Sequence, residues 1–150
     1  MILKNQLETQ RTLESTWVVQ AALDAVWRAL SDPTLWPRWW PVFREVEALR
    51  PGRADGLEAV YRLNGQETLR VCEVWPLVLL EAHTEAALVR WTLEHEEGNT
   101  FVHVSVWGFG EEVRFAQAMA AGAKGLAAHL GVRLLEVGSW NAATDQSIFP

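Results

Sequence analysis

Residues 21–47 read AALDAVWRALSDPTLWPRWWPVFREVE, and this stretch decides the fold. Its first ten residues have a helical period that gathers the apolar side chains on one face: Leu23, Val26, Trp27 and Leu30. Pro33 disfavours a helical conformation at Asp32, yet it suits the first position of a new helix. Three of the chain's nine tryptophans and three of its six prolines lie in residues 32–43. We therefore predict a helix followed by brief helical turns.

On either side of this stretch the hydrophobic period changes. Residues 13–19 (LESTWVV) alternate like a strand whose inner face is Leu13, Ser15, Trp17 and Val19. A loop signal at residues 51–56 precedes a run of antiparallel strands over residues 57–109. From Val113 the apolar residues return to helical spacing, which predicts a long, alanine-rich helix ending near Gly131. Residues 132–150 form a C-terminal extension whose structure the pattern leaves open.

Three turns predict which strand residues share a face. A turn at Gly98-Asn99 gives an apolar face made of the pairs Trp91–Val106, Leu93–Val104 and His95–Val102. A turn at Glu85-Ala86 agrees with that face through the pairs Leu80–Trp91, Ala82–Val89 and, on the outside, Glu81–Arg90. The hairpin signal Asn64-Gly65 places Tyr61 beside Thr68 and Arg70 beside Ala59.

Composition and charge exclude several classes of protein. A chain of 150 residues with 49% hydrophobic and 21% charged residues is typical of a single globular domain. The net charge of −6 and the lack of a basic stripe argue against nucleic-acid binding. The N-terminal segment resembles neither a secretory signal nor a membrane span, so we expect a cytoplasmic protein without stable membrane insertion. The single cysteine, Cys72, is expected to be a buried or half-buried thiol.

The order of elements predicts an α+β fold in which a curved antiparallel sheet wraps round the long helix. The segment AxxDAVWRALSDPTLWPRWWPVFREVE resembles the opening of the START-like (SRPBCC) superfamily, and its polyketide cyclase/dehydrase-like group is the nearest match. The later VRWTLEHEEGNTFVHVSVWGF resembles two strands of the same family. The resemblance reaches about Leu130. It implies a helix-grip fold of about seven strands, with two short helices after the first strand and a deep cavity between sheet and helix.

Members of this superfamily bind lipids, sterols, polyketides, quinones or other apolar molecules in that cavity. The side chains expected to line it here are mostly aromatic or aliphatic: Trp17, Trp36, Trp39, Trp40, Tyr61, Arg70, Trp91, Leu93, Val104, Phe115, Met119 and Gly122. Gly122 either permits close packing or leaves room for a ligand. Trp36 and one of Trp39 and Trp40 are expected to close the cavity mouth. The other would cover the outside or contact a second chain, so a homodimer stays open.

Polar candidates for catalysis are few. If Arg70 faces inward it could hold a carboxylate or enolate oxygen while Tyr61 donates a hydrogen bond. The alternative is a surface arginine with Tyr61 packed in the core. His95 could act as a base, or lie partly exposed at the rim of the sheet. No histidine pair has metal-ligand spacing, and no phosphate loop or GxSxG motif occurs, so we expect no metal and no cofactor.

Three functions therefore remain. The first is a carrier or sensor of a hydrophobic small molecule, favoured by the aromatic lining and the lack of a catalytic set. The second is a cyclase, dehydratase or hydrolase for a polyketide-like or aromatic substrate, with Arg70, Tyr61 and His95 as acid or base. The third is a protein-interaction module whose cavity is filled.

Overall fold

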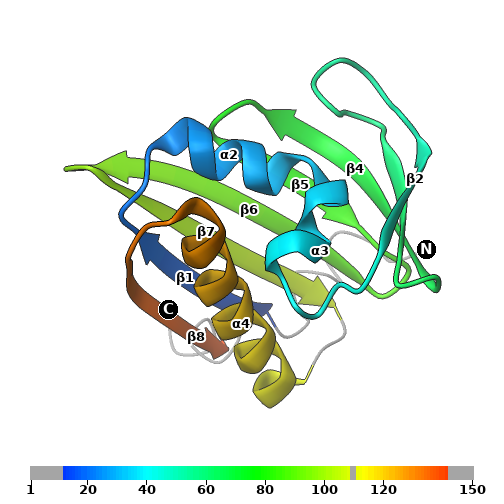
Figure 1. Cartoon of the computed structure of the whole chain (residues 1–150). Coiled ribbons are helices and arrows are strands. Elements are labelled where there is room, and N and C mark those ends of the chain that lie inside the picture. The colour runs from blue at the N-terminus through cyan, green and yellow to red at the C-terminus, as the bar shows by residue number, and fades with distance from the viewer. Residues whose placement is uncertain (1–11, 109–110, 142–150) are drawn as a thin grey trace, which may run out of the picture.

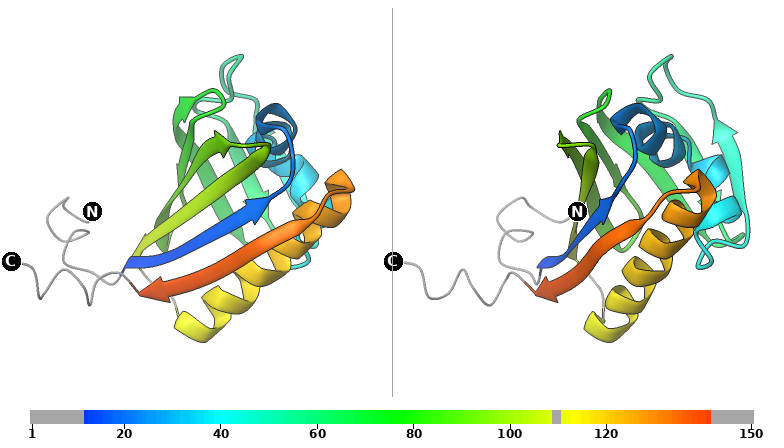
Figure 2. Two further views of the ribbon diagram at one scale, coloured as in Figure 1. Left: turned by 90° about the vertical axis from the view of Figure 1, so that its left-hand side faces the viewer. Right: turned by 60° about the vertical axis from the view of Figure 1, so that its left-hand side comes forward.

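The computed structural model describes residues 12–108 and 111–141. Eight antiparallel strands form one sheet in the order β2-β3-β4-β5-β6-β7-β1-β8. The sheet curves around the helix α4, and α2 and α3 lie on the same concave side (Figures 1 and 2). In chain order the elements are β1 (Thr12–Val19), α2 (Leu23–Ser31), the 3-10 turn η1 (Pro33–Leu35), α3 (Trp36–Trp39), β2 (Val46–Arg50), β3 (Val60–Leu63), β4 (Glu67–Trp75), β5 (Leu79–His83), β6 (Ala87–Glu96), β7 (Asn99–Gly108), α4 (Glu112–Leu130) and β8 (Leu134–Asn141). The predicted helix-grip architecture is confirmed.

The first strand and the two short helices follow the sequence pattern. The alternate residues of β1 that were expected to face inward are all buried: Leu13, Ser15, Trp17 and Val19. Asp32 ends α2 in an extended conformation and accepts a hydrogen bond from the Thr34 backbone N–H at 3.1 Å. Pro33 then begins η1 and Pro37 lies in the first turn of α3. The prolines thus limit η1 and α3 to three and four residues.

The hairpin between β6 and β7 keeps the predicted faces but shifts the predicted pairs by two residues. Its tight turn is Glu97-Gly98, with φ of 52° and 83°, one residue earlier than expected. Trp91 therefore pairs with Val104 and Leu93 with Val102. A two-residue shift preserves which side chains share a face. The pairs Leu80–Trp91, Ala82–Val89 and Glu81–Arg90 between β5 and β6 are confirmed.

The register of the hairpin between β3 and β4 differs by one residue from the predicted register. This difference moves the side chain of Arg70 to the opposite face of the sheet. Asn64 and Gly65 do form the turn, closed by the Gln66 N–H donating to the Leu63 carbonyl at 3.0 Å. The ladder resumes only at Glu67, so three residues separate the strands. The Asn64 side chain also bonds to the backbone of residues 42–45, which fixes this longer loop.

In the observed register Tyr61 pairs with Leu69 on the inner face, whereas Arg70 pairs with Val60 and its side chain is exposed. Of the two alternatives, the surface arginine with Tyr61 packed in the core is observed. Arg70 does not face inward, because a one-residue slip moves every side chain of a strand to the other face.

The long helix α4 ends as predicted. Gly131 adopts φ 69°, and the Val132 N–H donates to the Ala127 carbonyl at 2.9 Å. Its buried face is Met119, Gly122, Ala123, Leu126 and Ala127. Val113, which was expected to belong to the apolar face of this helix, is instead exposed near its start.

The extension left open by the sequence supplies the eighth strand. β8 pairs with β1, for example Ser139 with Ser15, and so places a strand beside α4 (Figure 2). The rest of the extension, residues 142–150, and the N-terminal segment 1–11 lie outside the described residues, as does Phe109 at the end of the predicted strand run. Within the described ranges, no helix is both long enough and apolar enough to cross a membrane.

Candidate functional site

Indole rings fill the centre of the space between the sheet and α4. Trp17 lies 5.4 Å from Trp40 between ring centroids, and Trp36 lies 5.7 Å from Trp40 and 5.5 Å from Trp91. Trp39 stacks on Trp40 at 5.2 Å. These five rings, here called the indole cluster, are each at most 4% exposed.

Two glycines of α4 let the tryptophans approach this closely. A Cβ built on Gly122 would lie 2.7 Å from the ring of Trp40 and 2.9 Å from that of Trp17. A Cβ on Gly125 would overlap the backbone carbonyl oxygen of Trp39. Gly122 therefore serves close packing and leaves no room for a ligand beside it.

Trp39 and Trp40 are both buried, which corrects the expectation that one of them faces outward. The helix ends at Trp39, and Trp40 has φ −112° and ψ 102°. The extended conformation of Trp40 breaks the 100° helical step that would otherwise have separated the two rings. The Trp40 indole N–H then donates to the Ala118 carbonyl at 2.9 Å and ties the end of α3 to α4.

Two indole N–H groups of the cluster lack an acceptor. Trp17 donates to Ser15 and Trp36 donates to the Leu30 carbonyl, at 3.2 Å and 3.1 Å. The indole nitrogens of Trp39 and Trp91 are buried without a hydrogen-bond partner. A buried donor left unpaired costs about 1–3 kcal/mol. Burial of these two unpaired N–H groups therefore destabilises the closed cluster.

Most residues expected at the cavity do meet in the interior. The buried members are Trp17, Trp36, Trp39, Trp40, Tyr61, Trp91, Leu93, Val104, Met119 and Gly122. Arg70 and His95 are exposed, His95 near the end of β6, so the three acid–base candidates do not converge. Burial raises the pKa of Tyr61, and the nearby Asp32 carboxylate raises it further.

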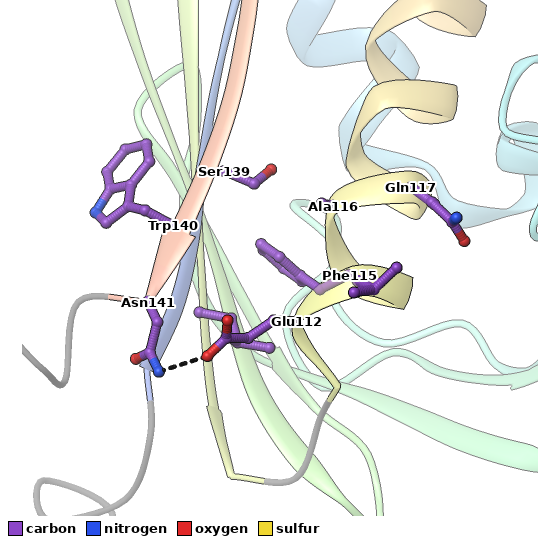
Figure 3. A pocket seen from close by; sticks show the side chains of 9 residues that line it. Glu112, Phe115, Ala116, Gln117, Ser139, Trp140 and Asn141 are labelled. Carbon is purple, nitrogen blue, oxygen red and sulfur yellow. Dashed lines mark hydrogen bonds between the residues drawn. The ribbon is translucent and has the colours of Figure 1, made fainter.

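A half-open pocket of about 360 Å³ lies where the N-terminal half of α4 faces β1 and β8. It is lined by Leu13, Glu112, Val113, Phe115, Ala116, Gln117, Ser139, Trp140 and Asn141. Phe115 and Ser139 point into the space between α4 and β8, and Trp140 points to the other side of β8 (Figure 3). The Asn141 amide donates to the Glu112 carboxylate at 2.9 Å across one end. Of the residues predicted at the cavity, Phe115 is the one that lines this pocket.

A chain of hydroxyl groups connects the pocket to the indole cluster. The Ser139 hydroxyl donates to the Ser15 hydroxyl at 3.1 Å, and Ser15 donates to the Gly138 carbonyl at 2.8 Å. Ser15, which is fully buried, also accepts the Trp17 indole N–H. These hydrogen-bonded hydroxyl groups thus form a polar connection between the pocket wall and the core.

Sequence reasoning missed the contribution of β8. Ser139 and Asn141 belong to the extension whose structure the pattern left open. The alternation in LLEVGSWN, whose half-buried residues Val137, Ser139 and Asn141 lie two apart, is the signal that could have indicated a strand.

The outer face of the sheet carries a second polar group. His103 contacts Glu14 through Nε2 at 2.9 Å and Thr16 through Nδ1 at 3.0 Å. Ser105 donates to the same Glu14 oxygen at 3.2 Å. Both hydrogen-bonding partners of His103 lie on β1, so the group links β7 to β1. In the part of the chain that the structure describes, no three His, Cys, Asp or Glu residues are grouped to hold a metal ion.

Cys72 is exposed, which corrects the expectation of a buried or half-buried thiol. It lies on the outer side of β4, where its Sγ is 3.5 Å from the Glu81 carbonyl oxygen. Desolvation by the surrounding chain, and then the Glu81 carboxylate, raise the pKa of this thiol to about 11.

Solved structures share this fold. The Zhui aromatase/cyclase from Streptomyces sp. R1128 has a TM-score of 0.69 and 16% identity, over 81% of this chain and 94% of that chain. CalU16 from Micromonospora echinospora has a TM-score of 0.62 and 18% identity, over 81% and 80% of the two chains. A protein from Rhodobacter sphaeroides has a TM-score of 0.57 and 25% identity, over 80% and 88%. A search of curated proteins gave no match.

The family is shown by a match of the sequence to a family model. The model of the family described as polyketide cyclase/dehydrase and lipid transport matches residues 10–131, from the start of β1 to the end of α4. The resemblance expected from residues 21–47 is thereby confirmed. The chain belongs to the polyketide cyclase/dehydrase and lipid transport family.

Proposed function

We propose that the protein binds a hydrophobic small molecule, as a carrier or sensor, in the pocket between α4 and β8. The pocket itself carries this proposal. Its volume of about 360 Å³ falls within the range of about 300–1,000 Å³ that is usual for small-molecule sites. A family that includes lipid transport supports an apolar ligand.

The lining favours an apolar ligand with one polar end. Leu13, Phe115 and Ala116 supply apolar surface, whereas the Glu112–Asn141 pair lies at one end. The Ser139 hydroxyl offers a further hydrogen-bonding group within the space (Figure 3). The indole cluster lies behind Ser15 and closes the interior end of the site.

Two alternatives differ in their support. The filled indole cluster favours the protein-interaction module, because such a module needs no internal ligand. A cyclase, dehydratase or hydrolase has less support, because Arg70 and His95 lie outside the interior. We take the chain as one START-like domain that acts in the cytoplasm, and its net charge of −6 argues against a nucleic-acid partner.

Native mass spectrometry of the purified protein, followed by extraction of bound compounds, tests the proposal. We expect an apolar compound to co-purify with the wild-type protein. Ala116→Trp would fill the pocket from α4 and abolish this binding. Ala128→Trp, on the exposed side of the same helix, is the matched control and should retain it. Absence of any bound compound, together with no response to added lipids or aromatic compounds, would instead support the interaction module.

A further inference from the structure

The turn between β4 and β5 exposes four consecutive apolar residues. Trp75 is 58% exposed, Leu77 40% and Val78 47%, and Pro76 between them is also exposed. Trp75 is the most exposed of the tryptophans in the structure's described ranges. We call these four residues the apolar tip. It lies at the same end of the molecule as α2 and the loop between β2 and β3 (Figure 1).

The backbone of the apolar tip is strained at Leu77, and this strain lowers the stability of the fold. The Val78 N–H donates to the Trp75 carbonyl at 2.9 Å, so Leu77 is the third residue of a tight turn and has φ 70°. Glycine or asparagine is preferred at such a position, because a side chain with a Cβ is disfavoured at positive φ. The chain thus keeps an aliphatic side chain at a position where glycine would be more stable. Such strain is typical of functional sites.

The size of the apolar tip argues against a stable protein interface. Four side chains of this kind expose on the order of 300 Å². A stable complex buries about 800 Å² on each partner. A narrow, protruding apolar turn is better matched to a deformable lipid interface, where tryptophan is also enriched.

The charges near the tip indicate which lipid headgroups it could contact. The tip carries no charged residue, and the chain's net charge of −6 disfavours an anionic surface. Pro76 borders a recess of about 410 Å³ that holds charges of both signs, on Arg53, Asp32 and Asp55. Trp27 lines the same recess. A headgroup with a phosphate and an ammonium matches these groups, since arginine binds phosphate and carboxylates and aromatic faces bind ammonium.

We propose that the apolar tip and the adjoining recess form a contact site for zwitterionic phospholipid bilayers. The tip enters the interface, and the recess takes a headgroup. The contact is peripheral, because it consists of one turn that enters the lipid interface. It is independent of the pocket between α4 and β8.

Flotation of the full chain with phosphatidylcholine vesicles measures this contact. We expect the wild-type protein to float, and to do so more weakly with phosphatidylglycerol vesicles at low salt. Leu77→Gly removes apolar surface and relieves the positive φ. It should lower the partition coefficient about fivefold while raising Tm by about 2–4 °C. Trp75→Thr should also weaken flotation, and Leu135→Thr, an equally exposed leucine on β8, should not.

The opposite changes in Tm and flotation for Leu77→Gly separate a lipid contact from a structural role, which would lower both. The proposal is overturned if the wild-type protein does not float with phosphatidylcholine, or if Leu77→Gly floats as well as the wild type. A preference for phosphatidylglycerol would also reject it. Light scattering that reveals a dimer dependent on Leu77 would assign the tip to a second copy of the chain instead.

Discussion

Gly125 is the position where the docking of α3 on α4 can be tested most sharply. A Cβ there would lie 2.8 Å from the carbonyl carbon of Trp39 and would overlap its oxygen. Both atoms belong to the backbone, so no side-chain rotation can relieve the contact. Gly125→Ala must therefore push α3 away from α4 or bend the helix.

The magnitude is a balance between two effects. Alanine is about 1 kcal/mol more favourable than glycine in a helix interior, so the substitution would stabilise the protein if there were no contact. Overpacking of a close interface costs about 1–3 kcal/mol. If α3 shifts, the hydrogen bond from Trp40 to the Ala118 carbonyl is lost, at about 0.5–1.5 kcal/mol. We expect a net destabilisation of about 0.5–3.5 kcal/mol, which lowers Tm by roughly 1–14 °C for a chain of this size.

Calorimetry and guanidinium unfolding measure this change, and near-UV circular dichroism reports the altered packing of the indoles. Gly138→Ala on β8 is the matched control. A Cβ there meets nothing within 4 Å, so its stability should change by no more than about 1 kcal/mol. A Gly125→Ala protein as stable as the wild type, or more stable, would refute the close approach of Trp39 to α4.

Three further experiments test the interior and the outer face. Trp91→Phe removes an indole N–H that has no acceptor, whereas Trp36→Phe breaks a hydrogen bond. Denaturant titration should therefore show that Trp91→Phe is less destabilising than Trp36→Phe by about 1–2 kcal/mol. Equal losses of stability would contradict the unpaired state of the Trp91 N–H. Ser15→Ala should lower the free energy of unfolding by about 1–3 kcal/mol, because it leaves buried groups without a partner. Cys72 should react with a disulfide reagent at pH 8 roughly 10-fold more slowly than an unperturbed cysteine. A thiol with pKa about 11 instead of 9.0 carries roughly 100-fold less thiolate, and the greater nucleophilicity of the more basic thiolate offsets part of this loss. Removing the carboxylate by Glu81→Gln should speed the reaction, and an unchanged rate would exclude its influence.

The candidate site was predicted best where one face of a strand or helix was strongly apolar. Trp17, Trp91 and Met119 are buried as expected, because their neighbours at periods of 2 and 3.6 leave one inward face. Arg70 was misplaced, because a single extra residue after Asn64-Gly65 reverses a strand, and the sequence does not reveal how the Asn64 side chain holds residues 42–45. The pocket could not be predicted, since three of its nine lining residues come from β8.

By itself, the sequence determined the family and the order of first strand, short helices, multi-stranded sheet and long helix, because hydrophobic period, proline positions and turn residues act over a few neighbouring residues. It also determined that the interior is aromatic and that Gly131 ends the long helix. Only the tertiary structure decided how three adjacent tryptophans are placed. The extended conformation at Trp40 and the absence of a Cβ at Gly122 and Gly125 together allow Trp39 and Trp40 to be buried at once. Such a fit depends on atoms that lie about 80 residues apart in the chain, and no local pattern encodes it.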